Sequence, residues 1–176
     1  LNLKKLLSRV DHTQLAVGGP LLTTNNRENS TDKIILLESR LTRWSALNAL
    51  LDRLPITPPV DAYFVSSRYG MRRDPFTKRR AFHGGVDLGG LPRSRVYTTS
   101  PGIITFVGWK GPYGRMVEVD HGLGFRTRYG HLRKILVKHN QRVTFRHKIG
   151  LMGSSGRSTG AHVHYEVLFD GKTVDP

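Results

Sequence analysis

Cysteine is absent from the 176 residues of this chain. Disulfide bonds therefore contribute nothing to its stability, and any bound metal ion must be held by His, Asp or Glu side chains. A run of eighteen apolar residues is also lacking, so no segment is expected to cross a membrane as a helix. Internal repeats are absent as well. A chain of this length can bury one hydrophobic core and carry a small second unit.

Acidic residues are scarce: 13 Asp and Glu stand against 28 Lys and Arg, which gives a formal net charge of +15. The imbalance is greatest between Arg126 and Lys148, where eight basic residues occur and no acidic one. Such a surface attracts polyanions, whether nucleic acid, anionic lipid or anionic cell-wall polymer, although general solubility explains the charge equally well. No aromatic-rich recognition motif accompanies the arginines, so we expect no nucleic-acid partner.

Residues 1–55 are predicted to form a helical N-terminal segment. Apolar residues recur every three or four positions over residues 1–10 and again from Lys33 to Leu54, which is typical of amphipathic helices. Thr31 or Asp32 is the expected N-cap of the second helix, and Pro55 is expected to end it. The chain starts at Leu1 rather than Met, so we expect a fragment. A targeting segment, a membrane anchor or more of a coiled coil are options outside it.

Residues 56–176 are predicted to form a second, mainly β domain. Three prolines between positions 55 and 59 mark a stiff linker before it. Short apolar runs separated by glycine turns then predict strands, and such short connections join antiparallel neighbours. The expected strands are Tyr63–Ser67, Ile103–Trp109, Arg115–Asp120, Phe125–Tyr129 and Val143–Met152, whereas residues 68–82 are expected to form a basic loop.

The stretch from Gly160 to Val167 alternates polar and apolar residues, as a β-strand with one buried face does. His162, His164 and Glu166 share one face of this strand. The apolar side chains on the other face, Val163, Tyr165 and Val167, are expected to enter the core. Two imidazoles on one strand face suit a zinc site, but a polar, solvent-facing edge strand is the alternative. Glu166 could hydrogen bond to a metal-bound imidazole or form a surface salt bridge, because its backbone lies about 6–7 Å from that of His164.

Two further stretches place polar residues beside glycines. Residues 83–90 contain four glycines, which disfavours a helix and indicates a loop or irregular strand whose backbone passes close to another group. A hydrolytic zinc site needs three protein ligands and an open position, and His83, Asp87 and one of the two strand histidines make one such set. Alternatively, Asp87 only holds a turn. The other strand histidine and His131 then remain for proton transfer or for stabilising an oxyanion.

Four motifs together resemble those of lysostaphin-type, LytM-like zinc metallopeptidases, which are peptidoglycan endopeptidases. They are His-x-x-x-Asp at 83–87, Tyr-Gly-His-Leu at 129–132, the Gly-Ser-Ser-Gly-Arg-Ser-Thr-Gly loop at 153–160 and His-x-His-Tyr-Glu at 162–166. The resemblance covers roughly residues 60–175 and implies an antiparallel β-groove with Zn²⁺ on His83, Asp87 and His164. It also implies that His131 and His162 act in catalysis beside a metal-activated water.

The same resemblance implies cleavage of a peptide bond in peptidoglycan cross-links or stems by an exported protein of the bacterial periplasm or cell envelope. With a basic groove and no attached wall-targeting repeat, the D-Ala to diamino acid cross-link is favoured over a pentaglycine bridge. The alternative is a catalytically inactive relative that binds and activates a cell-wall amidase as its regulatory partner. Such relatives have typically lost metal or catalytic residues, whereas all five are present here. Asn140 and Arg146 depart from the family pattern, in which glycine is usual at these turns.

Overall fold

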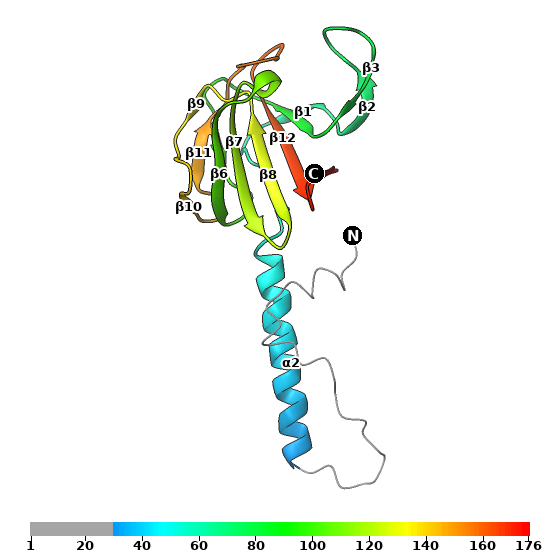
Figure 1. Ribbon diagram of the computed structural model, residues 1–176, viewed down its shortest axis with the longest axis vertical. Helices are drawn as coiled ribbons and strands as arrows, with labels where there is room; N and C mark the ends of the chain where they lie inside the picture. Colours follow the sequence, from blue (N-terminus) through cyan, green and yellow to red (C-terminus); the bar gives the residue numbers. More distant parts are fainter. Residues whose placement is uncertain (1–29) are drawn as a thin grey trace. The chain divides into compact units, whose positions relative to one another are not determined.

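Figure 1 shows the computed structural model, which describes residues 30–176 of the chain and side chains from residue 32 onward. The chain divides into two compact units, Leu1–Asp52 and Arg53–Pro176. The helix predicted for residues 1–10 lies outside the described residues.

The first unit contains one described helix, α2 (Ser30–Leu51). It begins three residues before the predicted start, so Thr31 and Asp32 lie inside the helix and neither is its N-cap. It also ends before Pro55, because a residue that precedes proline is disfavoured in the helical conformation and the last turn stops short of it. Its apolar stripe is largely exposed, Trp44 by 65%. No helix among the described residues is long and apolar enough to cross a membrane.

The second unit is a mainly antiparallel β structure, as the sequence predicted. Its strands are β1 (Phe64–Ser67), β2 (Gly70–Arg73), β3 (Arg80–His83), β4 (Val86–Gly89), β5 (Arg95–Tyr97), β6 (Gly102–Trp109), β7 (Arg115–Gly122), β8 (Phe125–Gly130), β9 (Lys134–Ile135), β10 (Arg142–Val143), β11 (Lys148–Leu151), β12 (His162–Phe169) and β13 (Lys172–Val174). A single 3₁₀ turn, η1 (Gly111–Tyr113), joins β6 to β7.

The main sheet has the strand order β1-β4-β12-β8-β7-β6-β10, with β13 paired to the outer half of β12. Strands β5, β11 and β9 form a second sheet, and β2 and β3 form a separate hairpin. In Figure 1 this hairpin lies beyond β12, on the opposite side of the main strands from β9, β10 and β11. The strand β12 is therefore central, which excludes the edge-strand interpretation of its histidines.

Alternation along β12 separates a core face from a site face. Val163, Tyr165 and Val167 are buried, as predicted, and pack with the buried side chains of neighbouring strands. Other fully buried side chains come from both sheets and their connections, among them Val96, Ile104, Val117, Val119, Tyr129, Leu132, Ile149 and Met152. Burial of this apolar surface is the main stabilising term of the unit.

One loop prediction was wrong. Residues 68–82 form the hairpin of β2 and β3, in which Met71 pairs with Phe82 and Arg72 with Ala81. Basic residues occupy much of both strands, so the stretch has few of the apolar residues by which a strand is predicted from sequence. The glycine-rich stretch after His83, predicted to be a loop or irregular strand, forms the strand β4 between β1 and β12, and its pairing with β1 is irregular between Val65 and Ser67.

The expected close approach of this glycine-rich backbone occurs at Gly85. A Cβ atom there would lie 2.3 Å from the carbonyl oxygen of Tyr165 and 2.9 Å from Cγ of Glu166. Only glycine allows this turn to press against β12. The turn thus brings the end of β3 and the start of β4 together beside the site face of β12.

Candidate metal centre

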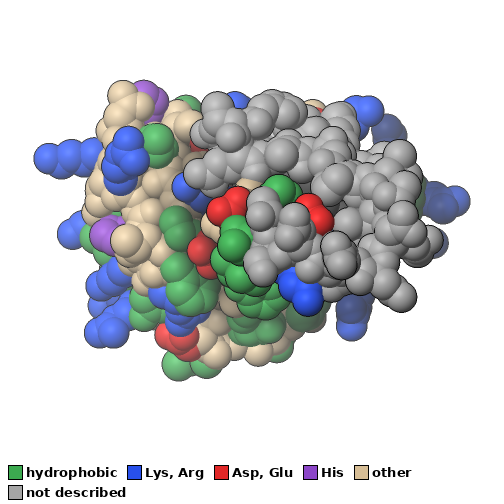
Figure 2. All heavy atoms as spheres, turned by 90° about the horizontal axis from the view of Figure 1, so that it is seen from below, with side chains coloured by type: hydrophobic (Ala, Val, Ile, Leu, Met, Phe, Trp, Pro, Cys, Tyr) green, Lys and Arg blue, Asp and Glu red, His purple; other side chains and the backbone are tan. Residues whose placement is uncertain are grey.

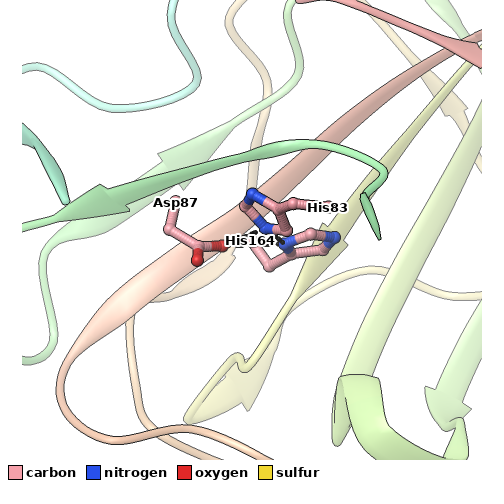
Figure 3. A group of neighbouring side chains, drawn as sticks. All are labelled: His83, Asp87 and His164. Carbon is pink, nitrogen blue, oxygen red and sulfur yellow. Dashed lines mark hydrogen bonds and ion pairs between the residues drawn. The ribbon is translucent and has the colours of Figure 1, made fainter. Parts of the chain in front are cut away.

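Three side chains from three different strands converge beside the main sheet (Figure 3). His83 ends β3, Asp87 lies in β4 and His164 lies in β12 directly opposite Asp87 in the strand register. His83 Nε2 lies 3.1 Å from Asp87 Oδ1 and 3.1 Å from His164 Nδ1, and His164 Nδ1 lies 2.8 Å from Asp87 Oδ1. All three residues are buried.

The outer nitrogen of each imidazole has its own hydrogen-bond acceptor. His83 Nδ1 donates to the carbonyl of Arg68 at 2.8 Å, and His164 Nε2 donates to Glu166 Oε1 at 3.0 Å. In the neutral rings the lone pairs of His83 Nε2 and His164 Nδ1 therefore face the Asp87 carboxylate. Three acceptors that point at one another require a proton or a cation between them.

Without a metal ion, a proton is expected at this point. Burial opposes the charged form of His164, but its hydrogen bonds with Asp87 and Glu166 outweigh this effect and raise its pKa to about 9. Burial likewise opposes the charged form of Asp87, yet hydrogen bonds with His164 and His83 hold its pKa well below the usual range. The pocket thus favours positive charge next to an ionised carboxylate.

The donor set fits a zinc ion. Two imidazole nitrogens and one carboxylate oxygen, all lying within 4.8 Å of one another, are a common ligand set for zinc in hydrolases. Bonds of about 2.0–2.1 Å in a tetrahedron place ligand atoms roughly 3.3–3.4 Å apart. The three observed separations, 2.8–3.1 Å, are slightly shorter and need only small side-chain adjustments.

The other two predicted histidines lie beside this cluster. His162 Nε2 is 3.7 Å from Asp87 Oδ1, and the ring of His131 lies 4.7 Å from that of His162 and 5.9 Å from that of His164, measured between centroids. His131 Nδ1 contacts the carbonyl of Ser155 at 2.7 Å, and His162 Nδ1 contacts that of Gly160 at 2.9 Å. Both rings therefore donate through Nδ1 and keep a free lone pair on Nε2.

His131 is held in a strained and desolvated position. It adopts φ 59°, a left-handed conformation that is uncommon for residues other than glycine. Burial and, to a smaller extent, the neighbouring His162 and His164 lower its pKa to about 4, against the opposing effects of the Ser155 carbonyl and of Asp87. Its imidazole is consequently neutral near pH 7.

A groove runs along the cluster between the β2–β3 hairpin and the loop at 153–160. Residues of both walls line it together with the histidines, among them Phe76, Tyr113 and Arg157. Arg157 donates to Asp74 at 2.7 Å, and its guanidinium lies over the ring of Phe76 at 4.6 Å. The β2–β3 hairpin, for which the sequence predicted a loop, thus forms one wall of the groove.

The basic residues of the 126–148 stretch are not all free surface charges. Arg126 pairs with Asp120, Arg128 with Glu118 and Glu166, and Arg146 with Asp61. Five others in this stretch are exposed: Arg133, Lys134, Lys138, Arg142 and Lys148. Figure 2 shows many Lys and Arg side chains on the face that it draws, with few Asp and Glu side chains among them.

The five candidate site residues lie close together in the structure, but the sequence did not predict some of the residues around them. Tyr113, in the η1 turn, donates to Glu166 Oε1 at 2.9 Å, and Arg128 NH1 donates to Glu166 Oε2 at 3.2 Å. No local motif marks Tyr113. The opposite charges of Glu118 and Arg128 on adjacent predicted strands were a usable signal, because the hairpin register places them face to face.

Comparison with known proteins identifies relatives of this chain. The model of peptidase family M23 matches residues 81–176. The chain is 42% identical over 120 residues to the peptidoglycan DD-endopeptidase ShyA of Vibrio cholerae, which covers 66% of this chain and 28% of ShyA. The crystal structure of a zinc containing peptidase from Vibrio cholerae aligns with a TM-score of 0.63 and 39% identity, covering 67% of this chain and 37% of that one.

The catalytic domain of the antimicrobial peptidase lysostaphin from Staphylococcus simulans has the same fold. It aligns with a TM-score of 0.60 and 28% identity, covering 65% of this chain and 89% of that domain. Against the longer curated relatives the coverage is lower, and the chain spans between 26% and 32% of the length of three of them.

Proposed function

Because the chain belongs to peptidase family M23, as its motifs suggested, we propose that it is a zinc-dependent endopeptidase that hydrolyses peptide bonds in peptidoglycan. The observation that carries the proposal is the convergence of His83, Asp87 and His164 on one point with their lone pairs facing inward. His131 and His162 line the groove beside this point, with their ring centroids 4.7 Å apart.

We assign the metal to His83 Nε2, Asp87 Oδ1 and His164 Nδ1. A zinc ion bound there supplies Lewis acidity to the attacking water and to the scissile carbonyl. The protein residues hold the cation and orient its ligands. Asp87 contributes the negative charge that holds the cation, while the carbonyl of Arg68 and the carboxylate of Glu166 keep the two imidazoles oriented.

His131 and His162 are assigned to proton transfer and charge stabilisation. Each keeps its Nε2 lone pair free, so each can accept a proton from the attacking water. Once protonated, an imidazole here can donate to the oxyanion or deliver the proton to the leaving amine. The two rings have the same hydrogen-bonding state, and we therefore assign these roles to the pair.

For the substrate, we propose the D-Ala to diamino acid cross-link. The relative ShyA carries the name peptidoglycan DD-endopeptidase. A groove flanked by exposed basic residues also suits stem peptides, which bear free carboxylates. This substrate places the working protein in the periplasm or cell envelope of a bacterium.

The test measures zinc content and turnover separately. Purified protein is loaded with zinc and incubated with sacculi, and mass spectrometry identifies the bond that is cut. His164→Ala should lose zinc and activity together. By contrast, His131→Ala and His162→Ala should keep zinc and lose on the order of a hundred-fold or more in rate.

Three results would contradict the assignment. A parent protein that binds no zinc would favour the inactive, amidase-activating relative. If His162→Ala binds no zinc whereas His164→Ala still binds it, the roles assigned to the two strand histidines must be exchanged. Products cut elsewhere than at the D-Ala to diamino acid bond would correct the substrate.

A further inference from the structure

A row of alternating charges crosses the site face of the main sheet and ends at the candidate metal centre. Glu118 on β7 lies directly opposite Arg128 on β8, and Arg128 lies directly opposite Glu166 on β12. Arg128 Nε donates to Glu118 at 2.7 Å, and its NH1 donates to Glu166 at 3.2 Å. The row continues along β12 to His164, whose Nε2 lies 3.0 Å from Glu166 Oε1.

The two carboxylates in the row have little access to water. Glu166 is 3% exposed and Glu118 7% exposed. A buried carboxylate without partners is costly, because it loses its hydration. Here Oε1 of Glu166 accepts from both His164 and Tyr113, while Oε2 accepts from Arg128. Burial opposes the charge of Glu166, but these partners outweigh it and lower its pKa.

We propose that Glu166, held in place by Arg128 and Tyr113, is the positioning residue that fixes His164 with Nδ1 toward the metal. This inference rests on the proposed zinc site and goes beyond its ligands. An imidazole can coordinate through either nitrogen, and the acceptor on the other nitrogen decides which. Glu166 is that acceptor for His164.

The distance along the strand does not prevent this contact. Same-face neighbours in a strand are separated by about 6–7 Å at the backbone, and the long Glu side chain spans the gap. The turn at Gly84 and Gly85 presses on the other side of Glu166, since a Cβ on Gly84 would lie 3.3 Å from its Oε1. The carboxylate is therefore confined by β8, by η1 and by this turn.

An amide at position 166 cannot reproduce the arrangement. Three donors point at the Glu166 carboxylate, whereas a Gln offers one oxygen and one NH₂ group. In Glu166→Gln, the NH₂ group must face at least one donor, Arg128 or the His164–Tyr113 pair. Either orientation weakens the hold on the imidazole and removes the negative charge beside it.

The experiment compares zinc affinity in the parent, Glu166→Gln and a matched control, Asp120→Asn. Asp120 also pairs across β7 and β8, with Arg126 at 3.1 Å, but it does not contact His164. Affinity is measured by competition with a coloured chelator at fixed pH, and thermal unfolding of the metal-free proteins checks folding. We expect Glu166→Gln to bind zinc about 10–100-fold more weakly. Asp120→Asn should stay within about twofold of the parent, because no zinc ligand depends on it.

A second measurement uses only the parent protein and therefore does not depend on the folding of a variant. In the zinc-loaded chain, imidazole ¹⁵N NMR should show His164 with its proton on Nε2 and its metal bond at Nδ1. Zinc bound through Nε2 of His164, or equal zinc affinity in Glu166→Gln and the parent, would overturn the inference. A parent without zinc would overturn the proposed function as well, so the two failures can be told apart.

Discussion

The raised pKa of His164 makes the metal-free protein sensitive to alkaline pH. The folded-state pKa is about 9, and an unfolded His titrates near 6.5. Because folding raises this pKa, the contribution to stability is fully present below about pH 6.5 and is lost as pH rises through about 9. The difference of about 2.5 units corresponds to about 3 kcal/mol at 1.36 kcal/mol per unit.

The assay is urea unfolding of protein treated with a chelator, at pH 6.0 and at pH 9.5. His164→Gln serves as the reference, because Gln does not titrate and other titrating groups affect both proteins alike. Between the two pH values the parent should lose about 3 kcal/mol more unfolding free energy than the variant. NMR titration of the metal-free parent should place the His164 midpoint near pH 9. Equal losses in parent and variant, or a midpoint near 6.5, would refute the reasoning.

Three further outcomes are expected. Ile149→Ala should lower the unfolding free energy by about 2–5 kcal/mol, because Ile149 is fully buried between β5 and β9. The 74% exposed Ile56 is its control and should tolerate Ala within about 0.5 kcal/mol. Sacculus binding should weaken from low to high salt, since exposed arginines such as Arg73 and Arg79 are screened by ions. Binding that does not change with salt would show that these charges do not attract the anionic wall. Residues 53–176 without the first unit should still bind zinc, because every proposed ligand lies within them; a folded but metal-free product would contradict this.

The sequence alone predicted the arrangement of residues that lie near one another along the chain. The alternation of β12 put His162, His164 and Glu166 on one face, since the side chains of a strand point to opposite faces in turn. Glycines around His83 and Asp87 indicated a close backbone approach, which the structure shows at Gly85 against β12. Asn140 and Arg146 stand at turns where the family usually has glycine, and both residues adopt positive φ in the structure.

Tertiary structure decided what depends on pairing between distant segments. Which nitrogen of His164 faces His83 and Asp87 follows from its contact with Glu166, and neither spacing nor composition contains that information. One wall of the groove is the β2–β3 hairpin, whose strands contain few of the apolar residues by which a strand is predicted from sequence. Local propensity acts through near neighbours along the chain, whereas strand register and side-chain contacts are set by packing across the sheet. For that reason the sequence predicted the five candidate site residues, and only the fold showed that Arg128 and Tyr113 contact Glu166, which in turn contacts His164.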